Sequence, residues 1–211
     1  MPKFKTLLGF IVVAIFLTGA EPALARHHHH HYDYDYDDAD SASGLAGDTL
    51  ILVRHAEKPD GDNAGPGLAP AGEARAKAYA DYFQHFQLDG APIKIGEIIA
   101  TADSDGSARP RLTVTPFSQS TGLKIEQPFP DKEVKALAHW LAAGDPNRTI
   151  LIAWHHGKMP KLLRELGADP DELLPDGTWP EDTYDWVIAL KYDDNGQLIE
   201  QKKIVEPAFA H

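Results

Sequence analysis

The chain contains no cysteine at any of its 211 positions. It therefore has no disulfide bond, and it has no lipid-modified cysteine that would tether it to a membrane. A chain without thiols is compatible with an oxidising compartment, because there is nothing in it to oxidise. Its length suffices for one domain with a substantial hydrophobic core.

Basic residues are also scarce. The chain has 20 Lys and Arg against 32 Asp and Glu, which gives a formal net charge of −12. A protein that binds the phosphate backbone of nucleic acid needs the opposite balance, so we expect no nucleic-acid partner. If the substrate is an anion, the few arginines have to gather in one place. Arg54, Arg109 and Arg111 are the candidates.

The most extended apolar run lies at the N-terminus, at residues 7–17, and it follows Lys3 and Lys5. Ala23-Leu24-Ala25 then provides the small-residue pattern of a signal-peptidase site. The run is shorter than the about 20 residues that span a bilayer, although an uncleaved anchor is the alternative. We expect residues 1–25 to be a cleaved signal peptide, with a periplasmic or secreted protein that has no stable membrane insertion.

Residues 26–47 have too little aliphatic content to form a core. They contain the histidine run His27–His31, alternating Tyr and Asp up to Asp38, and a small-residue linker. The histidine run is either an expression tag or a weak site for Zn²⁺, Cu²⁺ or Ni²⁺ helped by the aspartates. We expect a disordered leader that acts as a tether or scavenger, followed by one domain at residues 48–211.

Strand and helix patterns alternate within this domain. Strands are predicted at 49–53, 95–100 and 149–154 (the most apolar and therefore central), with a short edge strand at 124–126. Helices are predicted at 70–86, with Ala74, Ala78 and Phe83 toward the core, at 108–122, shortened by Pro116, at 131–143, and at 159–166. A β-hairpin is predicted at 184–192 and 198–205. The pattern predicts an α/β three-layer sandwich whose central sheet is mostly parallel, with an antiparallel edge hairpin.

Three of these apolar strands lead into His or Arg. Arg54-His55 follows the first strand, a polar loop after the second leads to Arg109, and His155-His156-Gly157 follows the third. Because the carboxyl ends of parallel strands meet at one edge of a sheet, we expect these side chains to share one surface. An imidazole beside a guanidinium is a nucleophile next to a clamp for an oxyanion.

These motifs resemble the histidine phosphatase superfamily, which has the phosphoglycerate-mutase-like fold. The residues that carry the resemblance are Arg54-His55-Ala56-Glu57-Lys58, Gly67-Leu68-Ala69-Pro70-Ala71-Gly72, Arg109-Pro110-Arg111-Leu112-Thr113 and Trp154-His155-His156-Gly157. The likeness extends over roughly residues 48–205. Four motifs in the family's order make a coincidence improbable, and the signal sequence indicates a small exported bacterial member.

The resemblance implies a phosphatase that forms a phosphohistidine on His55 and needs no metal or other cofactor. Arg54 and Arg109 would bind the phosphate, and Lys58 would add charge at the rim. A second histidine would neutralise the transferring group. His55 has to be neutral to attack, and the two arginines nearby are expected to depress its pKa. The substrate would be a phosphorylated small molecule or a phosphoprotein.

The second histidine is either His155 or His156. Neighbouring side chains on an extended backbone point to opposite sides, so we expect only one of the two to face the phosphate. Family members with a Trp-x-His-Gly pattern favour His156, whereas those with Gly-His-Ser favour His155. We favour His156 and assign the other ring a structural role.

The sequence departs from the family pattern at Ala56, where glycine is usual, and at Pro110, and it shows no evident general acid. The nearby carboxylates are more often caps or turn formers than acids; they are Asp103, Asp105, Asp131 and Glu133. The competing hypothesis is therefore a non-catalytic exported module that binds phosphate or scavenges metal.

Overall fold

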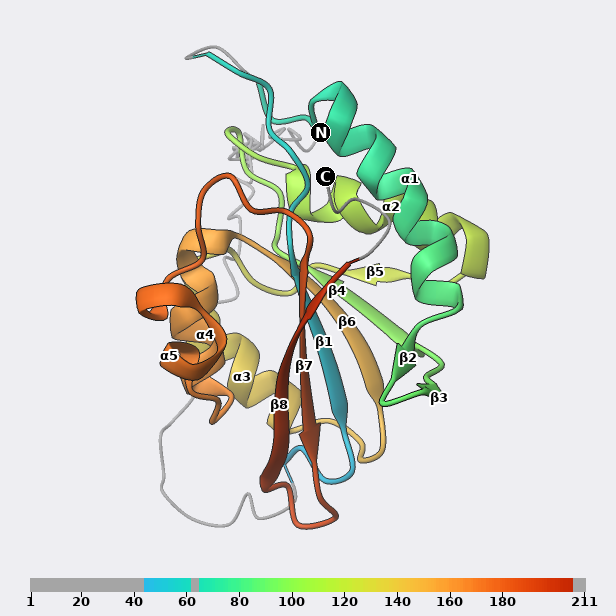
Figure 1. Cartoon of the computed structure of the whole chain (residues 1–211), viewed down its shortest axis with the longest axis vertical. Helices are drawn as coiled ribbons and strands as arrows, with labels where there is room; N and C mark the ends of the chain where they lie inside the picture. Colours follow the sequence, from blue (N-terminus) through green and yellow to red (C-terminus); the bar gives the residue numbers. More distant parts are fainter. Residues whose placement is uncertain (1–43, 62–64, 207–211) are drawn as a thin grey trace, which may run out of the picture. The chain divides into compact units, whose positions relative to one another are not determined.

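A computed structural model describes residues 44–61 and 65–206 of the chain. Its centre is a six-stranded sheet in the order β5-β4-β6-β1-β7-β8 (Figure 1). The strands β5, β4, β6 and β1 run parallel, and β7 and β8 form the antiparallel edge hairpin. Their bounds are β1 Thr49–Arg54, β4 Glu97–Ala100, β5 Ile125–Glu126, β6 Thr149–Trp154, β7 Trp186–Tyr192 and β8 Leu198–Val205. The predicted mixed sheet and its terminal hairpin are confirmed.

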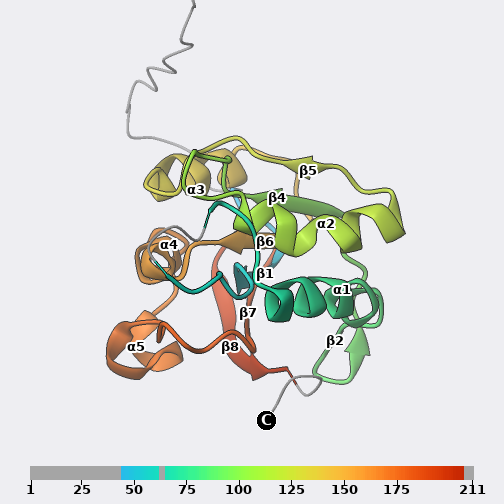
Figure 2. The ribbon, with the colours of Figure 1, turned by 90° about the horizontal axis from the view of Figure 1, so that it is seen from above.

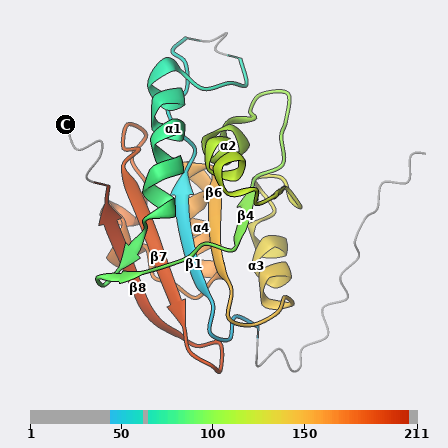
Figure 3. The same ribbon diagram turned by 90° about the vertical axis from the view of Figure 1, so that its right-hand side faces the viewer.

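Helices cover both faces of this sheet, as Figures 2 and 3 show. One face carries α1 (Pro70–Gln84) and α2 (Arg109–Thr121), and the other carries α3 (Val134–Ala142), α4 (Met159–Glu165) and α5 (Pro170–Leu173). Because side chains alternate along a strand, β1 supplies both cores: Ile51 and Val53 pack toward α1 and α2, while Leu50 and Leu52 pack toward α3 and α4. The three-layer prediction is confirmed.

The strands β1 and β6 form the buried centre of the sheet. They pair in parallel from Thr49 with Thr149 to Arg54 with Trp154, and β6 lies centrally, as predicted, with β4 and β1 as its neighbours. Both strands read as continuous apolar runs because helices cover them on both faces. This register brings the residues that follow Arg54 next to those that follow Trp154.

The core face of α1 differs from the prediction. Phe83 is buried as expected, but Ala74 is exposed and Ala78 is half-buried. The helix is rotated so that Arg75 is buried with carboxylate partners, and Tyr79 completes the core face. The buried face of the helix therefore includes an ion pair, which the spacing of its alanines does not reveal.

Pro116 does not shorten α2, contrary to the prediction. Proline removes one backbone hydrogen bond of the helix, and α2 continues past it to Thr121. The helix ends at Gly122, which adopts the left-handed conformation at φ 76° that favours glycine.

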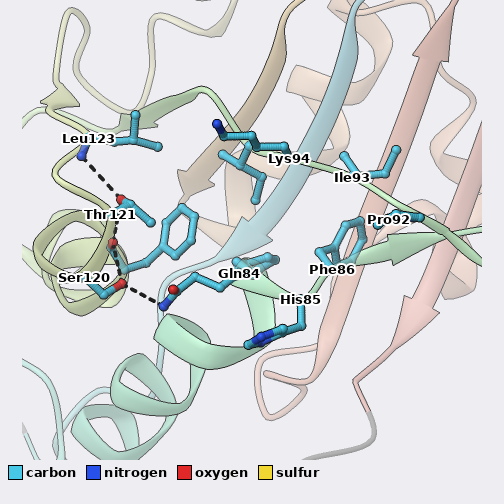
Figure 4. A pocket seen from close by; sticks show the side chains of 12 residues that line it. Gln84, His85, Phe86, Pro92, Ile93, Lys94, Ser120, Thr121 and Leu123 are labelled. Carbon is cyan, nitrogen blue, oxygen red and sulfur yellow. Dashed lines mark hydrogen bonds between the residues drawn. The ribbon is translucent and has the colours of Figure 1, made fainter.

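A small hairpin, β2 (Gln87–Leu88) and β3 (Ala91–Pro92), follows α1 and was not predicted. A pocket of about 690 Å³ is lined by the C-terminal ends of α1 and α2, by Pro92 of β3 and by the residues that follow it, with Phe83, Phe86 and Phe117 among its lining residues (Figure 4). Gln84 Nε2 donates to Ser120 Oγ across this pocket at 3.1 Å. The pocket lies at the C-terminal ends of these helices, whereas Arg109 begins α2 at its other end.

Residues 44–47 were expected to belong to the disordered leader, but they form a turn that packs on the domain. The Gly47 N–H donates to the Asp193 carbonyl at 2.8 Å, and Ala46 is buried. The expected signal peptide at 1–25 and the histidine run lie outside the described residues. In the part of the chain that the structure describes, no helix is both long and apolar enough to cross a membrane.

Candidate active site

The turn that follows β1 carries His55 into the interior of the molecule. His55 is buried at 3% exposure, and its backbone N–H donates to the Trp154 carbonyl at the end of β6. His55 Nδ1 lies 2.8 Å from the Ala56 carbonyl oxygen, which can only accept. The ring therefore carries its proton on Nδ1, and its Nε2 presents an unprotonated lone pair.

His55 is held in the neutral form. Burial is the main cause that lowers its pKa to about 3, and the charges of Arg54 and Arg109 lower it further. The hydrogen bond to Ala56 opposes this shift. The arginines thus act in the predicted direction, although desolvation acts more strongly. A neutral imidazole with a free nitrogen is the state that a nucleophile requires.

The turn after β1 is tied to both neighbouring helices. The Ala56 N–H donates to Thr113 Oγ1 at 2.8 Å, and that hydroxyl donates to the Arg109 carbonyl within α2. On the other side α1 approaches closely at Gly72, where a Cβ would lie 2.5 Å from the Glu57 carbonyl oxygen. Two of the sequence motifs, the one around Gly72 and the one ending in Thr113, therefore hold the turn that carries His55.

Arg54 is buried, and its guanidinium is held by neutral groups. Nη1 donates to three backbone carbonyls, those of Pro180, Glu181 and Thr183, at 2.8–3.0 Å. The guanidinium carbon lies 3.9 Å from the centre of the Tyr184 ring. Nε is buried without a hydrogen-bond partner among the described residues. Nε and Nη2 share one edge of the planar group, so this edge retains donors for an anion.

Arg109 shows the same pattern at the start of α2. Nη1 donates to the Gly65 carbonyl at 2.9 Å and Nη2 to the Gly106 carbonyl at 3.1 Å. Its Nε is also buried and finds no hydrogen-bond partner within the described part of the chain. Burial lowers the pKa of Arg109. Within the described residues, no carboxylate forms an ion pair with Arg54 or Arg109, so both keep their charge available for an anion.

Both His155 and His156 lie beside His55, and which of the two faces the phosphate stays a prediction. Their ring centres lie 5.2 Å and 6.0 Å from that of His55. The extended backbone ends at His155, and a 3₁₀ turn begins at His156, which redirects the second side chain toward the same side. The premise of strict alternation fails because the strand has already ended.

His156 has a hydrogen bond that assigns its proton. Its Nδ1 lies 3.1 Å from Arg54 Nη2, and a guanidinium can only donate. The proton of the neutral His156 ring therefore lies on Nε2. Burial, followed by the charge of Arg54, lowers the pKa of His156 to about 4. His55 and His156 are thus opposite tautomers: one presents a lone pair at Nε2 and the other an N–H.

Lys58 and Arg111, the other two basic residues predicted near the site, differ in their surroundings. Lys58 is exposed, and its charge contributes to the lowered pKa of His156. Arg111 is neutralised by Asp103, with Nε and Nη2 at 2.8 and 2.7 Å from the same carboxylate oxygen. That pairing lowers the pKa of Asp103, which makes it a poor proton donor.

Two other carboxylates act on the histidines. Asp131 works to raise the pKa of His155 against the larger effect of burial, and Glu181 does the same for His156. Glu133 is exposed and lies at the N-terminal cap position of α3. Within the described ranges 44–61 and 65–206, no three His, Asp or Glu side chains form a group that could hold a metal ion.

The sequence motifs did not point to the segment that positions Arg54. Its three carbonyl acceptors lie more than 120 residues from Arg54 in the chain. Trp179 holds this segment, because its Nε1–H donates to the Thr183 carbonyl at 2.8 Å. Backbone carbonyls have no sequence signature, so the aromatic residues Trp179 and Tyr184 are the signals that the sequence offers for this segment.

No protein-family model matches the chain, and no curated protein matches it. Among solved structures, the SixA protein of Agrobacterium tumefaciens is 19% identical with a TM-score of 0.48, and the match covers 73% of this chain and 96% of that one. The protein histidine phosphatase SixA in complex with tungstate is 16% identical with a TM-score of 0.46, covering 76% and 97%. The phosphoglycerate mutase of Plasmodium falciparum is 15% identical with a TM-score of 0.49, covering 79% and 94%.

These solved structures come from the superfamily whose motifs this sequence resembles. A likeness at such identities and TM-scores concerns the fold alone. The function therefore has to be inferred from the side chains that this chain brings together.

Proposed function

We propose that the domain hydrolyses phosphomonoesters through a phosphohistidine on His55. One observation carries this proposal. His55 and His156 are opposite tautomers, and they lie near two arginines that form no ion pair with a carboxylate among the described residues. His55 offers the lone pair of Nε2, while His156 offers an N–H, and the ring centres are 6.0 Å apart. Arg54 and Arg109 each add a buried Nε–H with no partner among the described residues. A nucleophile surrounded by donors suits phosphoryl transfer.

In the first step His55 Nε2 attacks phosphorus. The P–N bond forms while the ester P–O bond breaks, and the alcohol oxygen leaves with a proton. In the second step water attacks the phosphorus and returns a proton to the acid that protonated the alcohol, the P–N bond breaks, and inorganic phosphate is released. The Nε–H groups of Arg54 and Arg109 and His156 Nε2–H stabilise the charge on the transferring oxygens.

We propose Asp131 as the residue that protonates the leaving oxygen. The support is its position: its backbone carbonyl accepts from the buried Trp154 Nε1–H at 3.1 Å, which holds its segment beside the end of β6, and its charge lies near enough to act on the pKa of His155. An aryl phosphate has a good leaving group and needs little help from an acid, whereas an alkyl phosphate needs more. Asp131→Asn is therefore expected to reduce turnover of an alkyl phosphate at least tenfold more than that of p-nitrophenyl phosphate. Equal losses would refute this assignment.

The decisive experiment traps the intermediate. The full chain is incubated with a ³²P-labelled phosphomonoester and quenched, and the label is tested for the acid lability and base stability of phosphohistidine. We expect label on the wild type and on His85→Ala, an exposed histidine remote from the site, and none on His55→Ala. His55→Ala should also abolish turnover of p-nitrophenyl phosphate. Undiminished turnover in that variant would refute the mechanism.

A wild-type protein that binds phosphate but turns over no phosphomonoester between pH 4 and 8 would support the binding-module alternative. A protein truncated to begin at Gly44 separates the two roles, since 44–47 pack on the domain. If it keeps turnover and loses only Zn²⁺ or Ni²⁺ binding, the leader is an accessory to an enzyme.

We further propose that the protein is exported and that a phosphorylated small molecule or phosphoprotein is its substrate. The support for export is the sequence of residues 1–25. Cell fractionation with mass measurement of the mature N-terminus tests it. Full-length, uncleaved chain in the cytoplasm would contradict it.

A further inference from the structure

A buried ionic network lies directly behind the turn that carries His55. Arg75 of α1 binds Glu57 in a fork, with Nε 3.0 and 3.1 Å from the two carboxylate oxygens and Nη2 2.8 Å from one of them. Arg75 Nη1 also contacts Glu206 Oε2, at 3.5 Å. Glu206 follows β8 and is fully buried. One cation is therefore shared by two carboxylates.

This network reaches His55 through a single peptide group. The Ala56 carbonyl that accepts from His55 Nδ1 belongs to the same peptide as the Glu57 N–H. Any rotation of that peptide moves the acceptor that orients the His55 ring. The Glu57 carbonyl on the other side accepts from the Ala69 N–H at 2.9 Å, Gly72 packs against the Glu57 backbone, and the Glu57 side chain is the part of this turn that Arg75 holds.

The Glu206 contact differs from the Glu57 contacts. Its 3.5 Å separation from Arg75 is at the limit of a hydrogen bond, while the Glu57 bonds are 2.8–3.1 Å. Glu206 Oε1 is buried and has no hydrogen-bond partner in the part of the chain that is described. A protonated Glu206 fits this geometry, because an ionised one would draw Arg75 toward itself.

We propose, on the basis of the function proposed above, that Glu206 is a positioning residue: its ionisation pulls Arg75 away from Glu57 and loosens the peptide that orients His55. The other groups that face Glu206 are Tyr79 and Tyr82 of α1, Asp185 before β7, and Glu57. Asp185 and Glu57 disfavour a second negative charge and raise the pKa of Glu206, whereas Tyr79 favours the ionised carboxylate and lowers it. Burial is the main cause that raises the pKa of Glu206 to about 7, against the opposing charge of Arg75.

The test compares wild type, Glu206→Gln and the matched control Glu165→Gln, which makes the same change at an exposed position of α4. The kcat/KM for p-nitrophenyl phosphate is measured from pH 5.5 to 8.5, and taking the ratio of variant to wild type cancels the titration of the substrate. We expect Glu206→Gln to equal wild type within twofold at pH 5.5 and to exceed it at least threefold at pH 8.5, mainly in kcat. A ratio that does not change with pH would overturn the proposal.

A second measurement needs neither turnover nor a variant. The ¹⁵N resonance of His55 Nδ1 is followed in the wild type from pH 5.5 to 8.5. We expect a shift with a midpoint near pH 7, although His55 itself does not titrate there. An unchanged resonance would overturn the proposal even if the protein folds and turns over substrate. A clear shift in a protein without turnover would instead leave the positioning role standing and refute the catalytic one.

Discussion

Two buried arginines flank the turn after β1, and their partners have opposite chemistry. Arg54 meets backbone carbonyls, an aromatic face and a histidine nitrogen, whereas Arg75 meets two carboxylates. Burial lowers the pKa of Arg54 to about 10. Burial acts the same way on Arg75, but the hydrogen bonds and charges of its carboxylate partners outweigh it and raise its pKa.

This difference in partners separates an arginine that can bind an incoming anion from an arginine whose charge is already used in a structural ion pair. Carbonyls fix the position of a guanidinium and leave its charge available for an incoming anion, whereas carboxylates neutralise that charge. Arg109 follows the pattern of Arg54, with two carbonyls. Arg111 follows that of Arg75, with Asp103. Of the three arginines expected to gather for an anion, two are free to do so.

Arg54→Met has the largest expected effect and tests whether Arg54 binds the substrate. This variant removes donors from the site, so we expect kcat/KM for p-nitrophenyl phosphate to fall about a thousandfold. The free energy of unfolding should fall by only about 1–2 kcal/mol, because the carbonyls lose a donor but no charge is left unpaired. Steady-state kinetics and urea denaturation measure the two effects. Activity within tenfold of wild type would show that Arg54 does not act on the substrate.

Arg75→Met should lower the free energy of unfolding more than Arg54→Met does, and lower kcat/KM less. It leaves Glu57 and Glu206 without their cation, and breaking a buried ion pair costs about 3–5 kcal/mol of stability. Urea denaturation at pH 8 measures this loss. At pH 5.5 the loss should be smaller, because Glu206, whose pKa is raised to about 7, is then protonated in the folded state. A stability loss no greater than that of Arg54→Met would remove the distinction between the two arginines.

Trp179→Phe tests how firmly the carbonyls hold Arg54. The Trp179 Nε1–H and Arg54 Nη1 both donate to the Thr183 carbonyl, so loss of the indole donor loosens the segment. One hydrogen bond is worth about 1 kcal/mol, which corresponds to roughly a fivefold fall in kcat/KM. Trp140→Phe, on α3, is the matched control and should leave kcat/KM unchanged. Equal effects of the two substitutions would assign Trp179 a packing role only.

The smallest expected effect is the acid response of His55. An imidazole with the ordinary pKa of about 6.5 would be mostly protonated at pH 5.5, and activity would fall about tenfold. Because the pKa of His55 is lowered to about 3, we expect no such fall in kcat/KM between pH 7.5 and 5.5. The unfolded chain binds this proton more readily, so the corresponding stability is present above pH 6.5 and is lost as pH falls toward 3. A tenfold acid limb near pH 6.5 would contradict a neutral, desolvated His55.

Much of the fold was predictable because its signals are local. The apolar runs of β1 and β6 and the core face of α3 lie within single segments, where burial imposes a period of about two or 3.6 residues. The rotation of α1 was not predictable in this way. It depends on Arg75 meeting Glu57, 18 positions away, and Glu206, 131 positions away.

The candidate site likewise has features that the sequence predicted and features that it did not. The motifs were sufficient to select Arg54, His55, Arg109 and the two histidines as neighbours, since parallel strands end at one edge. They did not determine the direction of His155 and His156, which depends on the 3₁₀ turn that starts one residue after β6. They also missed the Pro180–Thr183 carbonyls, since any residue provides a carbonyl.

The amino-acid pattern was therefore enough to predict the sheet, its covering helices and the set of polar residues at its edge. Hydrophobic periodicity is a property of short segments, so it can be read from the sequence alone. The folded chain alone determined which arginines remain unneutralised and which nitrogen of each histidine carries the proton. Both depend on which oxygen or nitrogen lies within hydrogen-bond distance. That partner is usually a backbone atom or a side chain brought from a remote part of the chain.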